Sequence, residues 1–318
     1  MSGELHKRFR DPGVKVFVEP NAGDHVIVNA ISAAKSSVQL EIYLLTDRSV
    51  IKALEEDAHR GINVSVMLEP HPYGGGPSPQ RTLDELSAAG VKTKPTSSSF
   101  SLTHEKGMII DNATVYIMTA NFTLSALGGS RSTTNREYGI IDTNQQDVQA
   151  VVAIFQADWN RTTAHFNDSN LVVSPINSRS TFESLINGAH KSLLIEAEEM
   201  QDQDIEQAIV NAAKHGVQVQ VIMPQPRSTS EGDGSGDSNS QGITVISQGG
   251  AHVKEDPHLY MHAKIMVVDG QKAFVGSENI STASLDKNRE LGILISDQGV
   301  LNTLTQTFQQ DWGESQGL

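Results

Sequence analysis

A histidine and a lysine separated by one residue open a pattern of polar residues that occurs twice in this chain. The first copy consists of five residues at fixed intervals: His104, Lys106, Asp111, Thr119 and Asn121. The second copy has the same offsets, with serine for threonine: His262, Lys264, Asp269, Ser277 and Asn279. On an extended segment, a histidine and a lysine two residues apart point the same way, because side chains alternate between faces. One can attack or protonate a substrate while the other holds an anion.

These residue types match what cleavage of a phosphodiester requires. Lysines and asparagines can hold the anionic oxygens and stabilise charge that develops in the transition state. One histidine can attack phosphorus to form a phosphohistidine, while the other acts as general acid and then as general base for water or an alcohol. Thr119 and Ser277 could contribute hydroxyls to the site. The equally plausible alternative is that they only cap a turn, as Ser and Thr often do. The expected phosphate ligands are Lys106, Lys264, Asn121, Asn279, Thr119 and Ser277.

Two glutamates downstream of the motifs are candidates for orienting the histidines. A nucleophilic imidazole must be neutral at the attacking nitrogen, so its other nitrogen must hold a proton against an acceptor. Glu137 and Glu290 occupy the same place in a repeated Asn-Arg-Glu sequence, each after its own motif. The alternative is that they are surface carboxylates paired with Arg136 and Arg289.

The pattern H-x-K-x4-D-x6-G-S-x-N, used twice, resembles the HKD signature of the phospholipase D superfamily. The second copy matches throughout, whereas the first has Met118 and Thr119 where the second has Gly276 and Ser277. The resemblance implies a ping-pong mechanism without metal or cofactor, in which a downstream acidic residue orients each histidine.

The resemblance also implies roles for individual motif residues. Asp111 and Asp269 are expected to be structural rather than chemical. In several family members the N-terminal histidine attacks, so we assign His104 as nucleophile and His262 as general acid and base. The better match of the second motif favours the reverse assignment.

Apolar runs on both sides of each motif predict the strands that must position it. In the first half the predicted strands are Val14–Val18, Val38–Leu45, Asn63–Leu68, Val115–Thr119 and Tyr138–Ile141. Amphipathic patterns predict helices between them at His25–Ala34, Ser49–Arg60, Arg81–Ala89 and Gln146–Trp159. Strands that alternate with helices indicate an α/β fold.

The second half repeats this plan over nearly its whole length. The corresponding segments are Val16–Pro20 and Leu171–Pro175, Val38–Glu41 and Leu193–Glu196, Arg60–Leu68 and His215–Met223, and Phe155–Trp159 and Phe308–Trp312. A repeat this long is a duplicated domain. We therefore expect two similar α/β/α sandwich domains, residues 1–165 and 166–318. The resemblance implies that a pseudo-two-fold axis relates them and that they share one active site at their interface.

Composition limits the function classes. The chain has 318 residues, a net charge of −14 and no cysteine, which excludes disulfides and thiolate chemistry and disfavours long polyanionic partners. No run of about 18 apolar residues predicts a membrane-spanning helix. The N-terminal sequence lacks the apolar core of a secretory signal. The compartment therefore stays open: cytoplasmic, or secreted after removal of a signal.

The favoured function is a phospholipase D-type phosphodiesterase. It would hydrolyse glycerophospholipids at a membrane or micelle surface, as a monomer, releasing phosphatidic acid and a free head group. Transfer of the phosphatidyl group to an alcohol would use the same intermediate. Cardiolipin or phosphatidylserine synthesis is the related alternative. Its enzymes are commonly attached to membranes, so the absence of a predicted membrane anchor favours the hydrolase.

A nuclease is the other alternative, because relatives with this chemistry also cleave DNA or RNA. It would need a basic groove near the motifs, for which the candidates are Lys106, Arg131, Arg136, Lys254, Lys264, Lys287 and Arg289. A metal site built from His252, His258 and His262 is not expected, because residues four apart on a strand are about 13 Å apart.

Two polar loops, His71–Gln80 and Arg227–Gln241, follow corresponding strands of the repeat. Ligands of open α/β sheets bind beyond the carboxyl ends of strands. We predict that both loops rim the active site, although a tolerated surface insertion explains them equally well.

Overall fold

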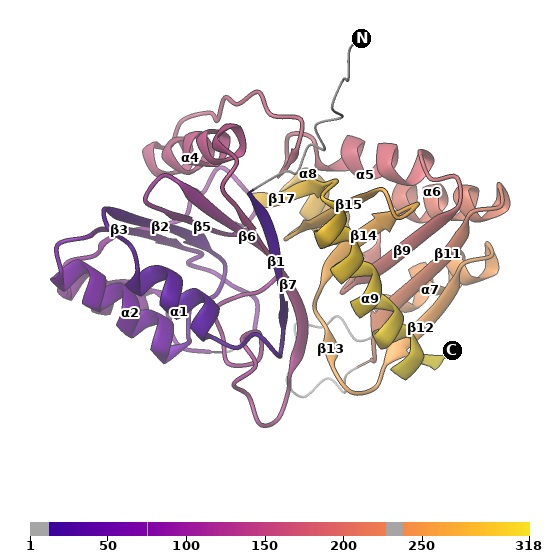
Figure 1. The fold of residues 1–318 in the computed structure, drawn as a ribbon, viewed down its shortest axis with the longest axis horizontal. Coiled ribbons are helices and arrows are strands. Elements are labelled where there is room, and N and C mark those ends of the chain that lie inside the picture. The colour runs from indigo at the N-terminus through magenta and orange to yellow at the C-terminus, as the bar shows by residue number, and fades with distance from the viewer. Residues whose placement is uncertain (1–12, 75, 227–237) are drawn as a thin grey trace, which may run out of the picture.

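The computed structural model describes residues 13–74, 76–226 and 238–318. The first half forms a mixed sheet with the strand order β1-β7-β6-β5-β2-β3-β4. In chain order its strands are β1 (Val14–Glu19), β2 (Ser37–Ile42), β3 (Asn63–Leu68), β4 (Lys92–Pro95), β5 (Lys106–Ile110), β6 (Thr114–Met118) and β7 (Asn135–Asp142). Figure 1 shows this sheet in indigo to magenta.

The second half forms a sheet with the order β8-β17-β15-β14-β9-β11-β12-β18. Its strands are β8 (Leu171–Ser174), β9 (Ser192–Ala197), β11 (Gln218–Pro224), β12 (His252–Asp256), β14 (Lys264–Val268), β15 (Lys272–Gly276), β17 (Glu290–Ile295) and β18 (Gln316–Gly317). Strand by strand, apart from the added β18, this order repeats that of the first sheet. The duplicated α/β fold expected from the sequence is confirmed.

Helices cover both sheets in the same way. The outer face of the first sheet packs against α1 (His25–Ser32), α2 (Arg48–His59) and α3 (Pro79–Ala88). The second sheet packs against α5 (Ser178–Asn187), α6 (Gln203–Lys214), α7 (Ser240–Gln248) and the short α8 (Thr282–Asp286). The long helices α4 (Gln145–Asn160) and α9 (Gln298–Glu314) pack on the inner faces. Within the described ranges, no helix has both the length and the apolar composition needed to cross a membrane.

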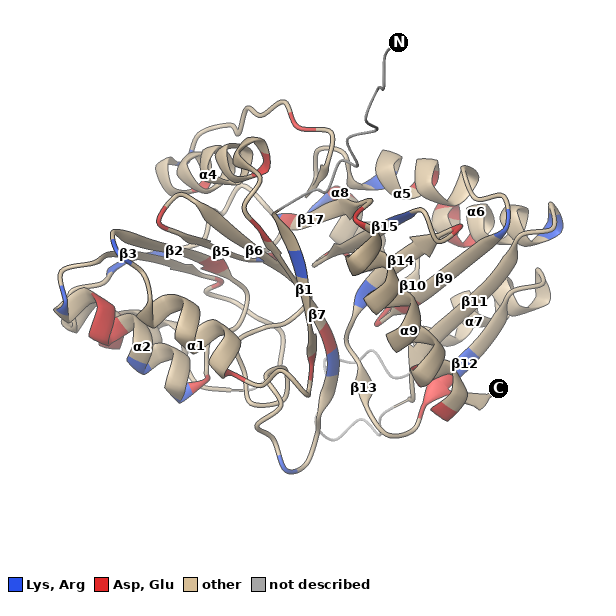
Figure 2. Ribbon diagram, viewed as in Figure 1, with Lys and Arg blue, Asp and Glu red and all other residues tan. Residues whose placement is uncertain are grey.

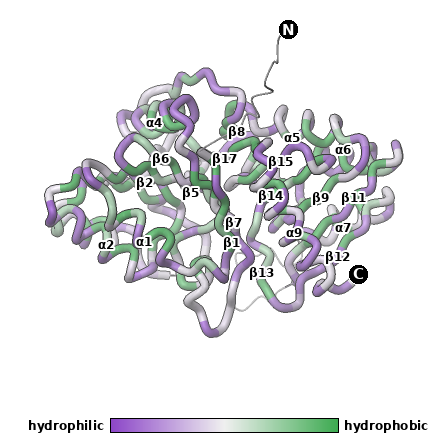
Figure 3. Tube along the Cα trace, viewed as in Figure 1, coloured by the Kyte–Doolittle hydropathy of each residue, from purple (hydrophilic) through white to green (hydrophobic). Residues whose placement is uncertain are grey.

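Alternating side chains divide each sheet between two cores. On β5, Met108 and Ile110 face the outer helices, whereas Ile109 faces inward. On β14, Ile265 faces inward in the same way. The inner core combines buried residues of both halves, so the two sheets share one apolar layer. The hydropathy-coloured trace in Figure 3 is most hydrophobic along these central strands.

The halves also exchange backbone pairing. The short strand β13 (Tyr260–Met261) belongs to the second half but pairs in parallel with β7 of the first, and the two lie side by side in Figure 1. Two further short strands, β10 (Met200–Gln201) and β16 (Ile280–Ser281), pair with each other. Because β13 leads directly into the second motif, its pairing with β7 fixes that motif against the first half.

The sequence difference between the two motifs is a compensated exchange of side-chain volume. A Cβ added to Gly276 would lie 2.4 Å from Cα of Gly292 and 2.6 Å from Oε2 of Glu278. In the first half, Met118 and Ala120 take the places of Gly276 and Glu278. Met118 is fully buried among the outer-core residues. The first half therefore has its large side chain at Met118 and a small one at Ala120, whereas the second half has the small residue first, at Gly276, and the large one at Glu278.

Candidate active site

The motif histidines lie just ahead of the central strands. His104 precedes β5 and His262 precedes β14, and each strand begins at the motif lysine. The extended segment expected to carry each histidine and lysine therefore becomes a strand only from the lysine onward. Nζ of Lys106 donates to the carbonyl of His104 at 2.5 Å, and Nζ of Lys264 donates to that of His262 at 2.6 Å. Each lysine thus folds back beside its own histidine.

Each histidine is paired with a glutamate from the other half of the chain. Nδ1 of His104 lies 2.7 Å from Oε1 of Glu290, which begins β17. Nδ1 of His262 lies 2.7 Å from Oε1 of Glu137 on β7. The interpretation of these glutamates as surface carboxylates is wrong, because both are fully buried. The crossed pairs bring the two motifs together at one site.

The second oxygen of each glutamate is also held. Oε2 of Glu137 accepts a hydrogen bond from the hydroxyl of Thr119 at 2.6 Å. Oε2 of Glu290 accepts one from the hydroxyl of Ser284. With both oxygens engaged, each carboxylate is fixed in orientation and presents one oxygen to its histidine.

Two residues assigned to phosphate binding have other partners. The hydroxyl of Thr119 donates to Glu137 and accepts from the backbone N–H of Tyr138. The hydroxyl of Ser277 donates to the carbonyl of Leu291 and accepts from its N–H. Both side chains are fully buried. We therefore correct their assignment: they support the strands and carboxylates behind the histidines.

Burial shapes the protonation of the first half-site. It lowers the pKa of Lys106 to about 7, helped by the positive charge of Lys264. Burial also lowers the pKa of His104, although the negative charge of Glu290 opposes this. A neutral His104 that donates Nδ1–H to Glu290 keeps its lone pair on Nε2. That nitrogen is the one able to attack.

The two motif asparagines are buried beside these groups. Oδ1 of Asn121 accepts the backbone N–H of Leu44 at 3.2 Å, which leaves its amide N–H groups for a ligand. Among the described residues, Oδ1 of Asn279 has no hydrogen-bond partner. An amide holds phosphate oxygens through its N–H groups, and this role of the two asparagines stays a prediction.

The motif aspartates occupy turns at the far ends of the two strands. Asp111 has a φ of 56° and its carboxylate accepts the backbone N–H groups of residues 35, 36 and 37. Asp269 has a φ of 54° and accepts those of residues 190, 191 and 192. Although desolvation opposes it, these hydrogen bonds lower the pKa of both carboxyls. The arrangement suits the structural role predicted for them.

Sequence reasoning missed two residues of the site. The ring of Tyr43 lies 4.9 Å from that of His104 and 5.4 Å from Nζ of Lys106. Glu198 lies beside the second motif, with Oε2 2.9 Å from Nζ of Lys264 and 3.4 Å from Nε2 of His262. The repeat carries a usable signal, since Glu198 follows Glu196 by the same two residues that separate Tyr43 from Glu41.

The basic groove that a nuclease would need is not built from the residues considered for it. Arg136 donates to both carboxylate oxygens of Asp311 at 2.7 Å, and Arg289 donates to both of Asp158 at 2.9 and 3.0 Å. Both arginines are buried, as are Lys106 and Lys264 in the site itself. Lys254 packs on a tryptophan ring. Of the seven candidates, only Arg131 and Lys287 are exposed. Figure 2 shows charged segments running through β1 and β7 in the middle of the molecule.

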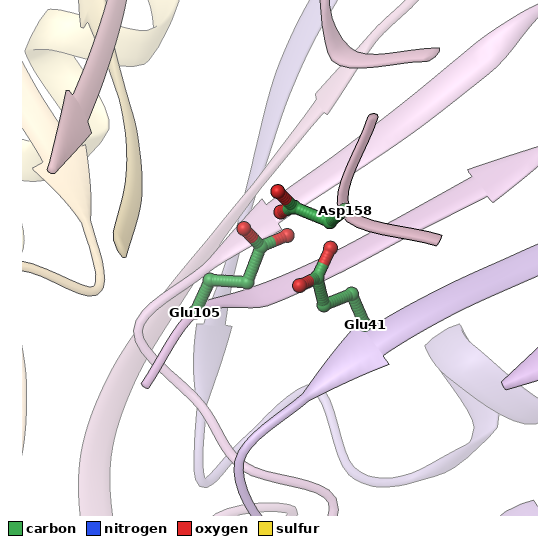
Figure 4. Close-up of side chains that lie close together, drawn as sticks. All are labelled: Glu41, Glu105 and Asp158. Atoms are coloured by element: carbon green, nitrogen blue, oxygen red, sulfur yellow. The ribbon is translucent and has the colours of Figure 1, made fainter. Parts of the chain in front are cut away.

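A buried acidic cluster lies behind the first half-site. Oxygens of Glu41, Glu105 and Asp158 lie within 4.8 Å of one another, and Figure 4 shows the three side chains converging. Burial and the charge of Asp158 raise the pKa of Glu105 to about 8. Burial and the charge of Glu105 raise the pKa of Glu41 well above its ordinary value. Arg289 neutralises Asp158. Among the described residues, both carboxylate oxygens of Glu41 and Oε2 of Glu105 have no hydrogen-bond partner.

The loop predictions are tested in part. The backbone N–H of Tyr73 donates to the hydroxyl of Tyr43 at 2.6 Å, which brings the loop 71–80 to the first histidine. Residue 75 of that loop and residues 227–237 of the second loop lie outside the described residues.

Comparison with known proteins gives related sequences. A family model described as "Cardiolipin synthase, PLD-like domain" matches residues 27–159 and 182–312. The probable cardiolipin synthase YwiE of Bacillus subtilis is 24% identical over 92% of this chain and 64% of its own length. The major cardiolipin synthase ClsA of the same organism is 25% identical over 93% of this chain and 70% of its own length. The chain thus spans about two thirds of these relatives.

Two solved structures share the fold. A phosphatidylserine synthase of Haemophilus influenzae aligns with a TM-score of 0.70 and 16% identity, over 97% of this chain and 88% of its own. A polyphosphate kinase of Porphyromonas gingivalis aligns with a TM-score of 0.72 and 15% identity, over 93% of this chain and 46% of its own. With the family model matching both halves, the chain belongs to the cardiolipin synthase family of phospholipase D-like domains.

Proposed function

We propose that this protein is a phosphatidyltransferase. It moves a phosphatidyl group from a glycerophospholipid to the hydroxyl of a second lipid or another alcohol, through a phosphohistidine. The relatives named as cardiolipin synthases support transfer over the hydrolysis favoured from the sequence. Hydrolysis is the same reaction with water as acceptor.

The observation that carries the proposal is the pair of crossed histidine–glutamate contacts at 2.7 Å, with a lysine beside each histidine. In the first step Nε2 of His104 attacks phosphorus, the bond from phosphorus to the leaving alcohol breaks, and His262 gives its proton to that oxygen. In the second step His262 takes a proton from the acceptor hydroxyl, whose oxygen attacks phosphorus and displaces His104. Lys106 and Lys264 hold the nonbridging oxygens throughout.

In the test, the full chain is incubated with phosphatidylglycerol vesicles in the presence of EDTA. The products are identified by mass spectrometry. Transfer between two phosphatidylglycerol molecules gives cardiolipin and glycerol, whereas water gives phosphatidic acid and glycerol. We expect cardiolipin, and a new phosphatidyl-alcohol when a primary alcohol is added. A labelled oligonucleotide is incubated in parallel.

Matched variants connect the products to the site. His104→Asn and His262→Asn should each lower turnover by at least about a thousandfold, because the nucleophile or the proton donor is lost. His252→Asn, at an exposed histidine on β12, should retain wild-type rates. Cleavage of the oligonucleotide without any lipid product would overturn the proposal in favour of a nuclease, and phosphatidic acid alone would return it to a hydrolase.

A further inference from the structure

The two half-sites differ in charge at one corresponding position. Tyr43 follows β2 and lies against His104, while Glu198 follows β9 at the same place in the repeat and lies against His262. Both histidines have a buried glutamate at Nδ1 and a lysine two residues on. The second half-site also places Nζ of Lys264 3.3 Å from Nδ1 of His262 and the ring of Tyr260 6.3 Å from its ring. An aromatic ring on one side is therefore replaced by a carboxylate on the other.

The carboxylate of Glu198 is ionised and held. Burial alone would raise its pKa, but the positive charges of His262 and Lys264 lower it below the ordinary range. Its Oε2 accepts from Lys264 at 2.9 Å and its Oε1 from the hydroxyl of Tyr260 at 3.1 Å. The titratable groups that face it are Lys264, His262, Tyr260, His104, Lys106 and Glu199.

This placement gives the two imidazoles different surroundings. His262 has a carboxylate at each nitrogen, Glu137 at 2.7 Å from Nδ1 and Glu198 at 3.4 Å from Nε2. Each carboxylate can accept a hydrogen bond from the ring nitrogen beside it, and neither can donate one. His104 has one carboxylate and a ring, which leaves its Nε2 free to attack. A carboxylate beside Nε2 of His262 also repels phosphate oxygens from the line along which that nitrogen would have to attack.

We propose that Glu198 is a positioning residue that makes the two histidines unequal, reserving His262 as the proton donor to the leaving oxygen and His104 as the nucleophile. The inference rests on the proposed phosphatidyl transfer. The contact of Glu198 with Nε2 is longer than its contact with Lys264. The leaving oxygen can therefore take its place at Nε2 while Glu198 stays on the lysine.

The test locates the covalent intermediate and follows the pH dependence of kcat. Wild type and Glu198→Gln are mixed with phosphatidylglycerol vesicles, quenched rapidly in alkali and digested, and the phosphatidyl adduct is mapped by mass spectrometry. Wild type should carry it on His104 alone. Glu198→Gln should carry it on both histidines, with kcat lowered about tenfold or more. The high-pH limb of its profile should move down by about one pH unit, because the donor loses a stabilising charge.

Three further variants control the result. Glu198→Asp keeps the charge and should keep the adduct on His104, whereas Glu198→Tyr copies the first half-site and should place it on both histidines. Asp204→Asn removes an exposed carboxylate on α6 and should behave as wild type. Thermal midpoints check folding of each variant.

The outcomes separate the two proposals. Wild type with an adduct on His262, or Glu198→Gln and Glu198→Tyr with an unchanged adduct and pH profile, would overturn the role of Glu198 while leaving phosphatidyl transfer intact. If the wild-type protein showed neither lipid turnover nor an adduct, the proposed function would be wrong. The role proposed for Glu198 in that function would then be wrong as well.

Discussion

The ionisable side chains of the two half-sites are buried as mutually compensating sets. Removing a charged group from water costs several kcal/mol unless partners offset it, and here each histidine, lysine and glutamate has a partner of opposite charge or a strong hydrogen-bond acceptor. Lys106 is compensated least, since its donor goes to a carbonyl. The lowered pKa of Lys106, about 7, reflects the missing negative partner. A bound anionic phosphate would supply that partner.

Lys106→Met should therefore raise stability while abolishing turnover. The folded pKa of about 7 lies below the ordinary 10.5, so between these values the unfolded chain binds more protons than the folded protein. The free energy of unfolding that Lys106 contributes therefore rises as pH increases from about 7 to 10.5. Below pH 7 the buried charge destabilises the folded protein most. Thermal midpoints of the variant and wild type should differ most near pH 6 and converge toward pH 10. A lower midpoint for the variant at pH 6 would contradict this.

At the scale of elements, the sequence predicted most helices and strands because their apolar periodicity reports burial directly. It missed that the strands begin at the lysines. The backbone ahead of β5 is taken by the other half: the N–H of His104 donates to the carbonyl of Arg289 at 2.9 Å. Only from Lys106 does the chain pair with β2. Local apolar periodicity cannot reveal that the backbone of His104 pairs with Arg289, which is 185 residues later in the sequence.

The same limit explains what the sequence showed of the site. The motif spacing identified the histidines and lysines, and the repeated Asn-Arg-Glu sequence identified both glutamates. Neither showed which glutamate contacts which histidine. Glu198 was missed because the first half has Tyr43 at the corresponding place, so the two halves share no residue type there. The difference between Tyr43 and Glu198 at corresponding places of the two halves is the signal that could have identified Glu198.

The turns after β5 and β14 depend on their aspartates. Asp269→Ala would leave three backbone N–H groups without their acceptor and should lower the free energy of unfolding by about 1–3 kcal/mol. Because hydrogen bonds lower the pKa of Asp269, its contribution is present above the ordinary pKa of aspartate and is lost as pH falls through the lower folded value. Urea unfolding at pH 7 and pH 2.5 checks this, with the exposed Asp204 changed to alanine as control. An equal loss at both pH values would count against it.

At the scale of the whole molecule, a shared inner core and two crossed arginine pairs join the halves. Arg136 of the first half binds Asp311 of the second, and Arg289 of the second binds Asp158 of the first. Each arginine directly precedes the glutamate that holds a histidine, so the same residues that join the halves also align the site. We propose that the domains divide near residues 165 and 166, between α4 and β8.

Asp158→Asn should destabilise the protein by about 3–5 kcal/mol, because it leaves Arg289 buried without a full counter-charge. Asp311→Asn, in the mirrored pair, should cost about as much. Both should also slow turnover, since the neighbouring glutamates shift with their arginines. Chemical denaturation followed by circular dichroism measures the first effect. Glu56→Gln, at an exposed carboxylate on α2, serves as the control. A loss below 1 kcal/mol in either variant would show that the arginines find other partners.

The difference between Tyr43 and Glu198 has a consequence for how such a site can originate. Two identical subunits could form the same crossed contacts, but every substitution would then appear twice, once at each histidine. A homodimer could not carry tyrosine at one position and glutamate at the other. Joining two copies in one gene removes that constraint, so that one imidazole can specialise without altering its twin. The fused chain thus permits a division of labour that an ancestral symmetric pair could not encode.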